Sequence, residues 1–367
     1  MKVLILGGRR YLGPRLVKRL IDCGHEPVLF NRGKTSAPLP VSNPVREYRG
    51  NRNSEADLES LLAKESFDAV VDSLSFSADD AELAVRVFSH RINRYLMISS
   101  VACYGRLCHV PADESHPYVD DQRAFPLPAN NYATGKRDAE HVFFAAFRDH
   151  GFPLIVIRPS VSYGYGRLFS IWGYSNRHVS RIRAGKPVIV PDTGEGLIQP
   201  VFIDDEAAII ERALITDEAI GEAFNCAGPV AVPLWQYFRA HADAIGKPVH
   251  TVEIPASLLH GFDPILCSRA SQNLIFNHAY DISKLQRFLQ FEHQFSLEDG
   301  IKHTIEFQDR WELLEPTGDD PDDWLIQAYQ QRDESVWQEC GESLREGKDY
   351  RLPEQPPLVK WAPDHYQ

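Results

Sequence analysis

The first half of the chain alternates short apolar runs with segments of helical periodicity. The apolar runs predict strands at 3–6, 28–30, 69–71, 95–99 and 154–157, and the periodic segments predict helices at 13–23, 54–65, 78–89 and 130–150. Such alternation is typical of a parallel sheet covered by helices on both faces. The second half is less regular. It predicts helices at 170–184, 205–215, 232–245 and 281–289, and short strands at 187–190, 200–203 and 249–254.

This order predicts an α/β fold: a doubly wound parallel sheet of the Rossmann type, with a smaller α/β C-terminal substrate-binding domain. We assign residues 1–165 to the dinucleotide-binding domain, to which the chain partly returns around 200–228, and residues 166–315 to the substrate-binding region. Residues 316–367 form an acidic extension that carries three of the six Trp. Because disordered tails seldom carry Trp, we expect this extension to be partly ordered and to pack on the body or on the neighbouring subunit of a homodimer.

Charge and composition restrict the classes of function. The net charge of −12 over 367 residues argues against a protein that wraps nucleic acid by neutralising phosphates. Of this charge, −7 lies from Pro316 onward, where 12 acids face 5 bases, so the body is only mildly acidic. No apolar run is long enough to span a membrane, and the six scattered Cys form no metal-binding pattern, which favours a reduced, cytoplasmic protein without a metal site.

A glycine-rich turn follows the first predicted strand and precedes a helix. Its residues are Gly7, Gly8, Arg9, Arg10, Tyr11, Leu12 and Gly13. Glycines at this place let the backbone approach a pyrophosphate, and the helix N-terminus offers N–H groups to the anion. Arg10 stands where a middle glycine would be expected, and its guanidinium is an additional candidate for gripping phosphate.

The end of the second strand bears on the choice of dinucleotide. An acid there would bind both hydroxyls of the adenosine ribose and repel a 2′-phosphate. This chain instead has Asn31, followed by Arg32 and Lys34. The pattern therefore favours NADP(H) over NAD(H). Asn51, after the third strand, is expected to face the edge of the adenine.

Tyr132 and Lys136 are four residues apart on the predicted helix 130–150, so they share one face of it. A neighbouring ammonium and a positively charged nicotinamide would favour the phenolate, and Tyr132 could then act as general acid or base near neutral pH. Ser99 and Ser100 end the preceding strand, where Ser100 would orient the reacting oxygen and Lys136 would bind the nicotinamide ribose. A second YxxxK pair, Tyr280 and Lys284, lies outside the strand–helix repeat and is set aside.

Several ordered motifs together give a resemblance to the extended short-chain dehydrogenase/reductase superfamily, in its epimerase/dehydratase-like branch. These motifs, spread over about residues 1–310, are LILGGRRYLG, MISSVACYG, YATGK, IRPSVSYGYG, VFIDD, FNCAG and FSLEDGI. The resemblance implies a catalytic set of Ser100, Tyr132 and Lys136, with Gly7, Gly8 and Gly13 at the cofactor. The GGRRYLG loop followed by FNRGKT looks closest to an atypical subgroup that includes proteins similar to the chloroplast stem-loop-binding proteins.

Two positions depart from the nucleotide-sugar enzymes of that superfamily. Val161 stands where an Asn holds the substrate phosphates, and Ile198 stands where an Arg grips the pyrophosphate. An unpaired diphosphate in an apolar pocket would be costly. Candidate replacements for the lost grip are Arg167, Arg177, Arg181 and Arg183.

The sequence therefore favours an NAD(P)-dependent oxidoreductase or epimerase that acts, by Tyr-assisted hydride transfer, on a hydroxyl or carbonyl of a sugar-like small molecule. It does not separate a dehydrogenase or reductase from an epimerase. Two alternatives stay open because a fold does not fix a function: an RNA-binding or scaffold protein, and a cofactor-sensing regulator without turnover.

Overall fold

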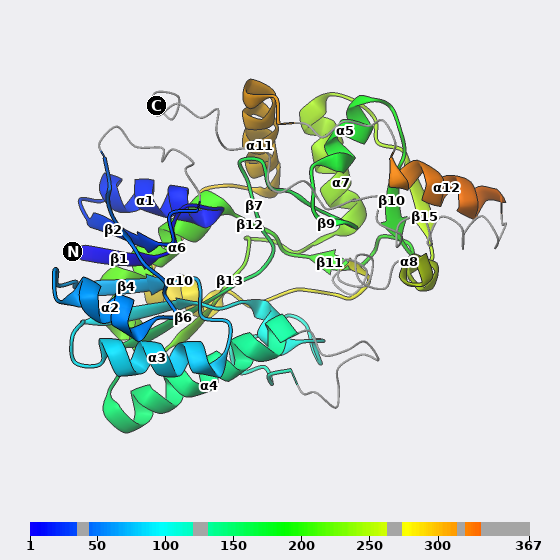
Figure 1. Ribbon diagram of the computed structural model, residues 1–367. Coiled ribbons are helices and arrows are strands. Elements are labelled where there is room, and N and C mark those ends of the chain that lie inside the picture. Colours follow the sequence, from blue (N-terminus) through cyan, green and yellow to red (C-terminus); the bar gives the residue numbers. More distant parts are fainter. Residues whose placement is uncertain (35–43, 120–130, 263–273, 314–319, 332–367) are drawn as a thin grey trace.

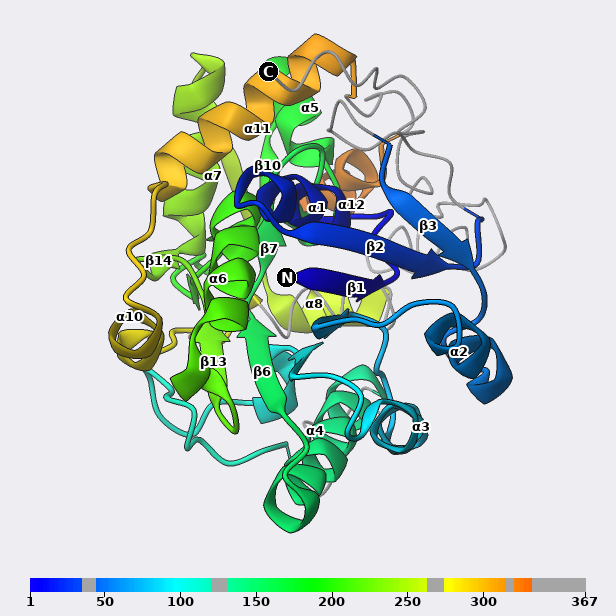
Figure 2. The same cartoon turned by 90° about the vertical axis from the view of Figure 1, so that its left-hand side faces the viewer.

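Seven parallel strands form the central sheet of the computed structural model, which describes residues 1–34, 44–119, 131–262, 274–313 and 320–331. The strand order is β13-β6-β5-β4-β1-β2-β3 (Figures 1 and 2). Their bounds are β1 Lys2–Leu6, β2 Glu26–Asn31, β3 Arg46–Arg49, β4 Ala69–Asp72, β5 Arg94–Ile98, β6 Leu154–Pro159 and β13 Ala223–Cys226. The predicted doubly wound sheet is confirmed.

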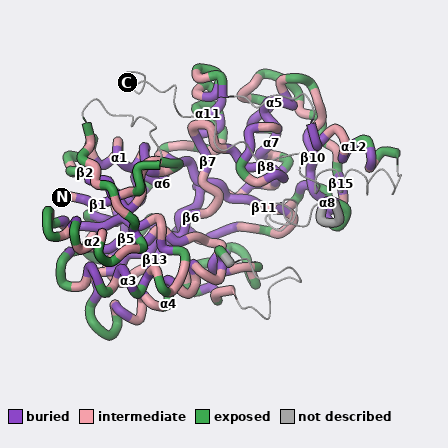
Figure 3. The backbone as a smooth tube through the Cα atoms, in the orientation of Figure 1, coloured by how far each residue is buried: buried purple, intermediate pink, exposed green. Residues whose placement is uncertain are grey.

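Helices cover both faces of the sheet, as the alternating pattern predicts (Figure 2). On one face α1 (Leu12–Asp22) packs against α6 (Ile203–Ile215), and on the other α3 (Ala78–Phe88) packs against α2 (Glu55–Leu62) and α4 (Asn131–His150). Each face has its own buried apolar cluster, so the inner strands of the sheet are buried at their centres, whereas the edge strand β3 is partly exposed (Figure 3). The short η1 (Val101–Tyr104) follows β5, and η2 (Asp217–Ala219) and α10 (Ser283–Leu289) flank β13.

Local signals explain where these helices begin and end. Ser54 accepts the Asp57 N–H and Ser77 accepts the Asp80 N–H, so serine side chains cap the starts of α2 and α3. Gly24 follows α1 with a φ of +77°, the left-handed conformation that glycine adopts at a helix end.

A second group of elements packs around its own apolar core. It contains the helices α5 (Arg177–Arg183), α7 (Leu234–Ile245), α8 (Ala256–Phe262), α11 (Leu297–Trp311) and α12 (Pro321–Gln331). Its paired strands are β7 (Ser162–Tyr163) with β12 (Val201–Phe202), β8 (Phe169–Ser170) with β9 (Gly173–Tyr174), β10 (Val188–Pro191) with β15 (Thr251–Ile254), and β11 (Leu197–Ile198) with β14 (Val232–Pro233).

Several features differ from the sequence predictions. The helix predicted at 170–184 begins only at Arg177, because β8 and β9 form a hairpin whose turn reaches Gly173 at a φ of +76°. No residue range was predicted for the edge strands β3 and β13, although Asn51 was expected to follow a third strand. The helix α11 was not predicted, although Ser296 and Asp299 form a capping box at its start.

The expected partial order of the extension is confirmed by α12. This helix packs against β10 and β15 of the same chain, and Leu325 and Ile326 are buried there. Trp337 and Trp361, the other Trp residues of the extension, lie outside the described residues.

Candidate active site

The glycine loop occupies the carboxyl end of β1, where β1 and β4 send their following helices to opposite faces of the sheet. Open α/β sheets bind ligands at such a switch point. A Cβ on Gly13 would lie 2.4–2.5 Å from backbone atoms of Gly8, and a Cβ on Gly8 would lie 2.5 Å from the Leu29 side chain. Only glycine fits at these two positions, so the loop has the close backbone approach that a dinucleotide pyrophosphate requires.

The remaining loop residues prepare the start of α1. Tyr11 is the N-cap at a φ of +53°, and no side chain caps the first-turn N–H groups. Leu12 begins the helix, while Arg10 is exposed and its carbonyl accepts the Gly13 N–H at 2.9 Å. No acid lies in the first turn of α1, so this end of the helix suits an anion.

A carboxylate lies beside Asn31 that sequence reasoning missed. Glu47, from the neighbouring strand β3, accepts from Asn31 Nδ2 at 2.5 Å and from Arg9 Nε at 3.2 Å. The hydrogen bond from Arg9 holds the pKa of Glu47 below its ordinary value. The acid sought at the end of β2 thus comes from the adjacent strand. The parallel pairing of β2 with β3 sets Asn31 opposite Arg49, two residues after Glu47 on the same strand. The position of Glu47 beside Asn31 could be found only from this strand pairing.

Asn51 and Ser99 have side chains that are engaged elsewhere. Asn51 Oδ1 accepts the Asn53 N–H at 3.2 Å in the turn before α2, so its position opposite an adenine stays a prediction. Ser99 is buried, and its hydroxyl donates to Glu140, which also forms an ion pair with Arg158. The structure therefore separates the Ser99 side chain from that of Ser100.

Ser100 and Tyr132 are brought together as the sequence predicts. Ser100 caps η1, where its Oγ accepts the Ala102 N–H at 3.1 Å, and its side chain is also hydrogen-bonded to the Tyr132 phenol. Burial raises the pKa of Tyr132 above its ordinary value, while Ser100 and the charge of Arg167 act in the opposite direction. The side chain nevertheless remains 42% exposed. Its proton is therefore held firmly but is accessible.

Lys136 lies one helical turn further on, and its ammonium is turned toward backbone carbonyls. Nζ donates to Ser75 O and to Ile98 O, both at 2.8 Å, and lies 4.4 Å from the centroid of the Phe76 ring. The Tyr132 ring centroid is further away, at 5.9 Å. Burial lowers the pKa of Lys136 to about 8, although Asp72 and Glu140 act in the opposite direction.

The sequence predicts that the Lys136 ammonium and a bound nicotinamide together favour the phenolate of Tyr132, and this stays a prediction. In the structure, burial is the main cause of the raised pKa of the phenol. Lys136 is turned toward the two carbonyls, and the Tyr132 ring lies near Phe76, with 6.2 Å between ring centroids.

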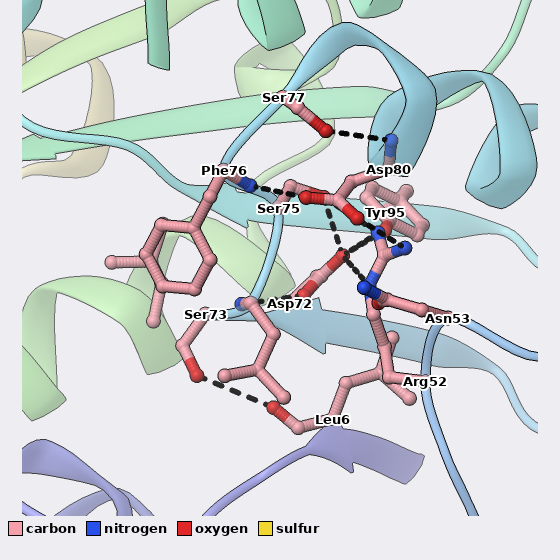
Figure 4. Close-up of polar contacts among 12 residues, drawn as sticks. Leu6, Arg52, Asn53, Asp72, Ser73, Ser75, Phe76, Ser77, Asp80 and Tyr95 are labelled. Atoms are coloured by element: carbon pink, nitrogen blue, oxygen red, sulfur yellow. Dashed lines mark hydrogen bonds and ion pairs between the residues drawn. The ribbon is translucent and has the colours of Figure 1, made fainter. Parts of the chain in front are cut away.

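A buried polar cluster around Asp72 was not predicted (Figure 4). Asp72, at the end of β4, accepts from Arg52 Nη2 at 2.6 Å, from the Tyr95 hydroxyl at 2.6 Å and from Ser75 Oγ at 2.7 Å. Burial alone would raise the pKa of Asp72, but Arg52 brings it below its ordinary value. Because the Ser75 carbonyl holds Lys136, this cluster positions the Lys136 ammonium. A buried strand that ends in an acid was the available sequence signal.

The second YxxxK pair lies apart from this site. Tyr280 is buried and its hydroxyl contacts His278 Nδ1 at 3.1 Å, whereas Lys284 forms an ion pair with Glu222 at 2.7 Å. Lys284 lines a cavity of about 530 Å³ together with Glu114 and Arg158, at the β13 edge of the sheet.

The lowered pKa of Lys136 predicts a pH dependence of stability. Between about pH 8 and pH 10.5 the unfolded chain would keep a proton that the folded protein has released, so the free energy of unfolding should rise with pH through this window. Relative to a Lys136→Met variant, the wild type should gain about 3 kcal/mol by pH 10.5. Urea titrations of both proteins near pH 7.5 and pH 10 measure this gain. An unchanged gap would show that Lys136 has an ordinary pKa.

Comparison with known proteins agrees with this arrangement. The profile of the NAD dependent epimerase/dehydratase family matches residues 3–227. The chain belongs to this family. Its members include NAD-dependent epimerases, dehydratases and reductases. In the described part of the chain, no helix is long and apolar enough to cross a membrane.

Two curated relatives and one solved structure show how the family resemblance extends over the chain. The 2′-dehydrokanamycin reductase of Streptomyces kanamyceticus is 27% identical over 257 residues, which are 70% of each chain. The chloroplast stem-loop binding protein of 41 kDa b of Arabidopsis thaliana is 24% identical over 86% of this chain and 76% of its own. The dTDP-glucose 4,6-dehydratase of Bacillus anthracis, solved with NAD, has a TM-score of 0.67 at 16% identity over 84% of this chain and 97% of its own.

Proposed function

We propose that this epimerase/dehydratase family member is an NAD(P)-dependent reductase that converts a carbonyl of a sugar-like small molecule into a hydroxyl. One observation carries the proposal: three side chains meet where β5 and α4 adjoin. Ser100 acts on the Tyr132 phenol as a hydrogen-bond partner, and Lys136, one helical turn further on, donates to Ile98 O of β5 at 2.8 Å. The segment after β4 connects this group to the glycine loop, because Ser75 O accepts from Lys136 Nζ at 2.8 Å and Ser73 Oγ donates to Leu6 O at 3.2 Å.

Tyr132, Ser100 and Lys136 each have one role in the proposed reaction. Tyr132 is the proton donor, because its raised pKa keeps the phenol protonated at neutral pH. Ser100 orients the substrate oxygen beside that phenol. Two N–H groups of Lys136 are used by carbonyls, and the third is assigned to the nicotinamide ribose. A bound dihydronicotinamide supplies the hydride to the carbonyl carbon, so the products are the alcohol and the oxidised dinucleotide.

The reductive direction is supported by the name of a relative. The Streptomyces relative is named a 2′-dehydrokanamycin reductase. Ile198, at the position of the missing pyrophosphate grip, is buried and apolar, which weighs against a nucleotide-diphosphate sugar bound in the usual manner.

The test is oxidation of reduced dinucleotide by the purified protein with a panel of keto-sugars and other small ketones. The proposal expects carbonyl-dependent oxidation and a dinucleotide that can be extracted from the purified protein. Binding of dinucleotide without oxidation by any carbonyl would instead support a cofactor sensor. A salt-dependent shift of RNA without turnover would support the RNA-binding alternative.

We further propose that the dinucleotide is NADP(H). Arg32 and Lys34 follow Asn31 in the sequence, Arg49 lies beside Gly33, and the carboxylate Glu47 next to Asn31 is already paired with Arg9. A 2′-phosphate would therefore meet a net positive charge. Solved neighbours in the family contain NAD, so the preference requires its own test.

Replacing Arg32 with Ala should weaken NADPH binding about 10-fold and leave NADH binding nearly unchanged, because only NADPH carries the 2′-phosphate. Dissociation constants from fluorescence titration of both dinucleotides measure the difference. Arg86→Ala, which removes an exposed arginine on α3, is the matched control. Equal losses for the two dinucleotides would contradict a 2′-phosphate contact.

A further inference from the structure

Three of the four arginines that could replace the missing anion grip already have carboxylate partners. Arg177 pairs with Asp320 at 3.1 Å, Arg181 pairs with Asp320 at 2.5 Å, and Arg183 pairs with Asp309 at 2.5 Å. These pairs bind the second group of elements together. They leave Arg167 as the candidate among the four.

Arg167 is held between two aromatic rings. Its Cζ lies 3.8 Å from the centroid of the Tyr11 ring in the glycine loop and 3.4 Å from that of the Tyr174 ring on β9. The rings are 43% and 36% exposed. Stacking fixes the plane of a guanidinium while leaving its in-plane N–H groups available for a bidentate anion. Arg167 therefore joins the dinucleotide loop to the substrate-binding group of elements.

The hydrogen-bonding capacity of Arg167 is incompletely used. Its side chain is hydrogen-bonded to Tyr174, yet its buried Nε has no partner. Among the residues that the structure describes, no carboxylate lies within the 4.0 Å that defines an ion pair with Arg167. A buried donor without an acceptor is unfavourable, so the arrangement is suited to an incoming oxyanion.

The charge of Arg167 acts on two titratable groups. These are the Tyr132 phenol and Glu206, a carboxyl that is only 2% exposed. Burial raises the pKa of Glu206 to about 7, while a hydrogen bond with Ser162 and the charge of Arg167 act in the opposite direction, and Glu206 Oε2 has no hydrogen-bond partner. Because Glu206 is partly protonated at neutral pH, it does not fully neutralise Arg167.

We propose that Arg167 binds an oxyanion of the substrate, a carboxylate or a phosphate attached close to the reacting carbonyl. This rests on the proposed reductase function and narrows its substrate class to anionic carbonyl compounds. The stack on Tyr11 and Tyr174 limits the reach of the guanidinium, so the anion must be near the carbon that Tyr132 serves. Neutral and cationic carbonyl compounds lack this interaction.

Calorimetric titration of the full-length protein saturated with oxidised dinucleotide tests the proposal, because no reduction occurs in that state. The probes are acetoacetate, its uncharged methyl ester, inorganic phosphate and dTDP. Wild type should bind at least one oxyanion probe, and Arg167→Gln should weaken that binding about 10- to 100-fold. If Arg167→Gln weakens only the binding of acetoacetate, the oxyanion of the substrate is a carboxylate. If it weakens only the binding of phosphate or dTDP, the oxyanion is a phosphate. The methyl ester should bind the two proteins equally.

Two further variants serve as controls for Arg167→Gln. Arg183→Gln removes an arginine of α5 that is paired with Asp309 of α11, so it should leave every probe affinity unchanged. Arg167→Lys keeps the positive charge but lacks the planar guanidinium that binds an anion through two N–H groups, so it should bind the probe with intermediate affinity. Circular dichroism of each variant checks folding.

The proposal is overturned if no oxyanion probe binds the wild type, or if Arg167→Gln retains full affinity. An equal loss of dinucleotide affinity in Arg167→Gln would also overturn it, because Arg167 would then serve the cofactor. Failure of the reductase function has a different result: no carbonyl compound of the panel oxidises the reduced dinucleotide, although oxyanion binding still depends on Arg167.

Discussion

Tyr132→Phe is expected to lower turnover by about 100- to 10,000-fold, because it removes the proton donor while keeping the ring. Dinucleotide affinity and thermal stability should hardly change, since the Tyr132 side chain is 42% exposed. Steady-state kinetics with a substrate found in the carbonyl panel, together with dinucleotide titration, measure both effects. A reduced kcat at unchanged cofactor affinity would place the defect in the chemical step.

Tyr280→Phe provides the matched control for this substitution. It removes a hydroxyl from the other YxxxK pair, whose Tyr280 is buried and contacts His278 away from Ser100. Turnover of this variant should stay close to that of the wild type. If Tyr132→Phe also kept turnover within about threefold, a role of the phenol in proton transfer would be refuted.

Arg181→Met is expected to destabilise the protein by about 3–5 kcal/mol, because it leaves buried carboxylates without their main cation. The Arg181 side chain is fully buried, and it pairs with Asp320 at 2.5 Å, Asp323 at 2.9 Å and Asp322 at 3.4 Å. These aspartates attach α12 to α5. Urea titration followed by Trp fluorescence reports the loss, since Trp172 is hydrogen-bonded to Asp322.

The loss of stability in Arg181→Met should depend on pH, because Asp322 of the same buried cluster titrates near neutral pH. Burial raises the pKa of Asp322 to about 7, so between about pH 4 and pH 7 the folded protein holds a proton that the unfolded chain releases. The contribution of Asp322 to stability therefore falls as pH rises through this window. Arg181 lowers the pKa of Asp322, so without Arg181 this fall should continue to higher pH, and the variant should lose more stability at pH 8 than at pH 5.5.

Arg183→Met on the same helix is the control for Arg181→Met. Its partner Asp309 is 46% exposed, and such surface pairs contribute at most about 1 kcal/mol. Similar losses in the two variants would contradict a special role for the buried cluster in attaching α12.

Much of the fold could be predicted because its signals are local. The apolar run of β1, the serine caps of α2 and α3 and the glycine after α1 each depend on neighbours within a few residues. Residues 170–176 were predicted as helix because β8 and β9 have only two residues each. Strands this short show too little periodicity to be distinguished from the start of a helix.

The sequence by itself determined the doubly wound sheet, the glycine loop and the spacing of Tyr132 and Lys136, because strand alternation, glycine sterics and helix period are properties of contiguous residues. The tertiary structure decided which side chains meet across distant segments. It placed Glu47 beside Asn31, turned Lys136 toward Ser75, and set Arg167 between Tyr11 and Tyr174. Charges and pKa values depend on such meetings, since burial and through-space partners, rather than neighbours in the chain, set the energy of an ionised group.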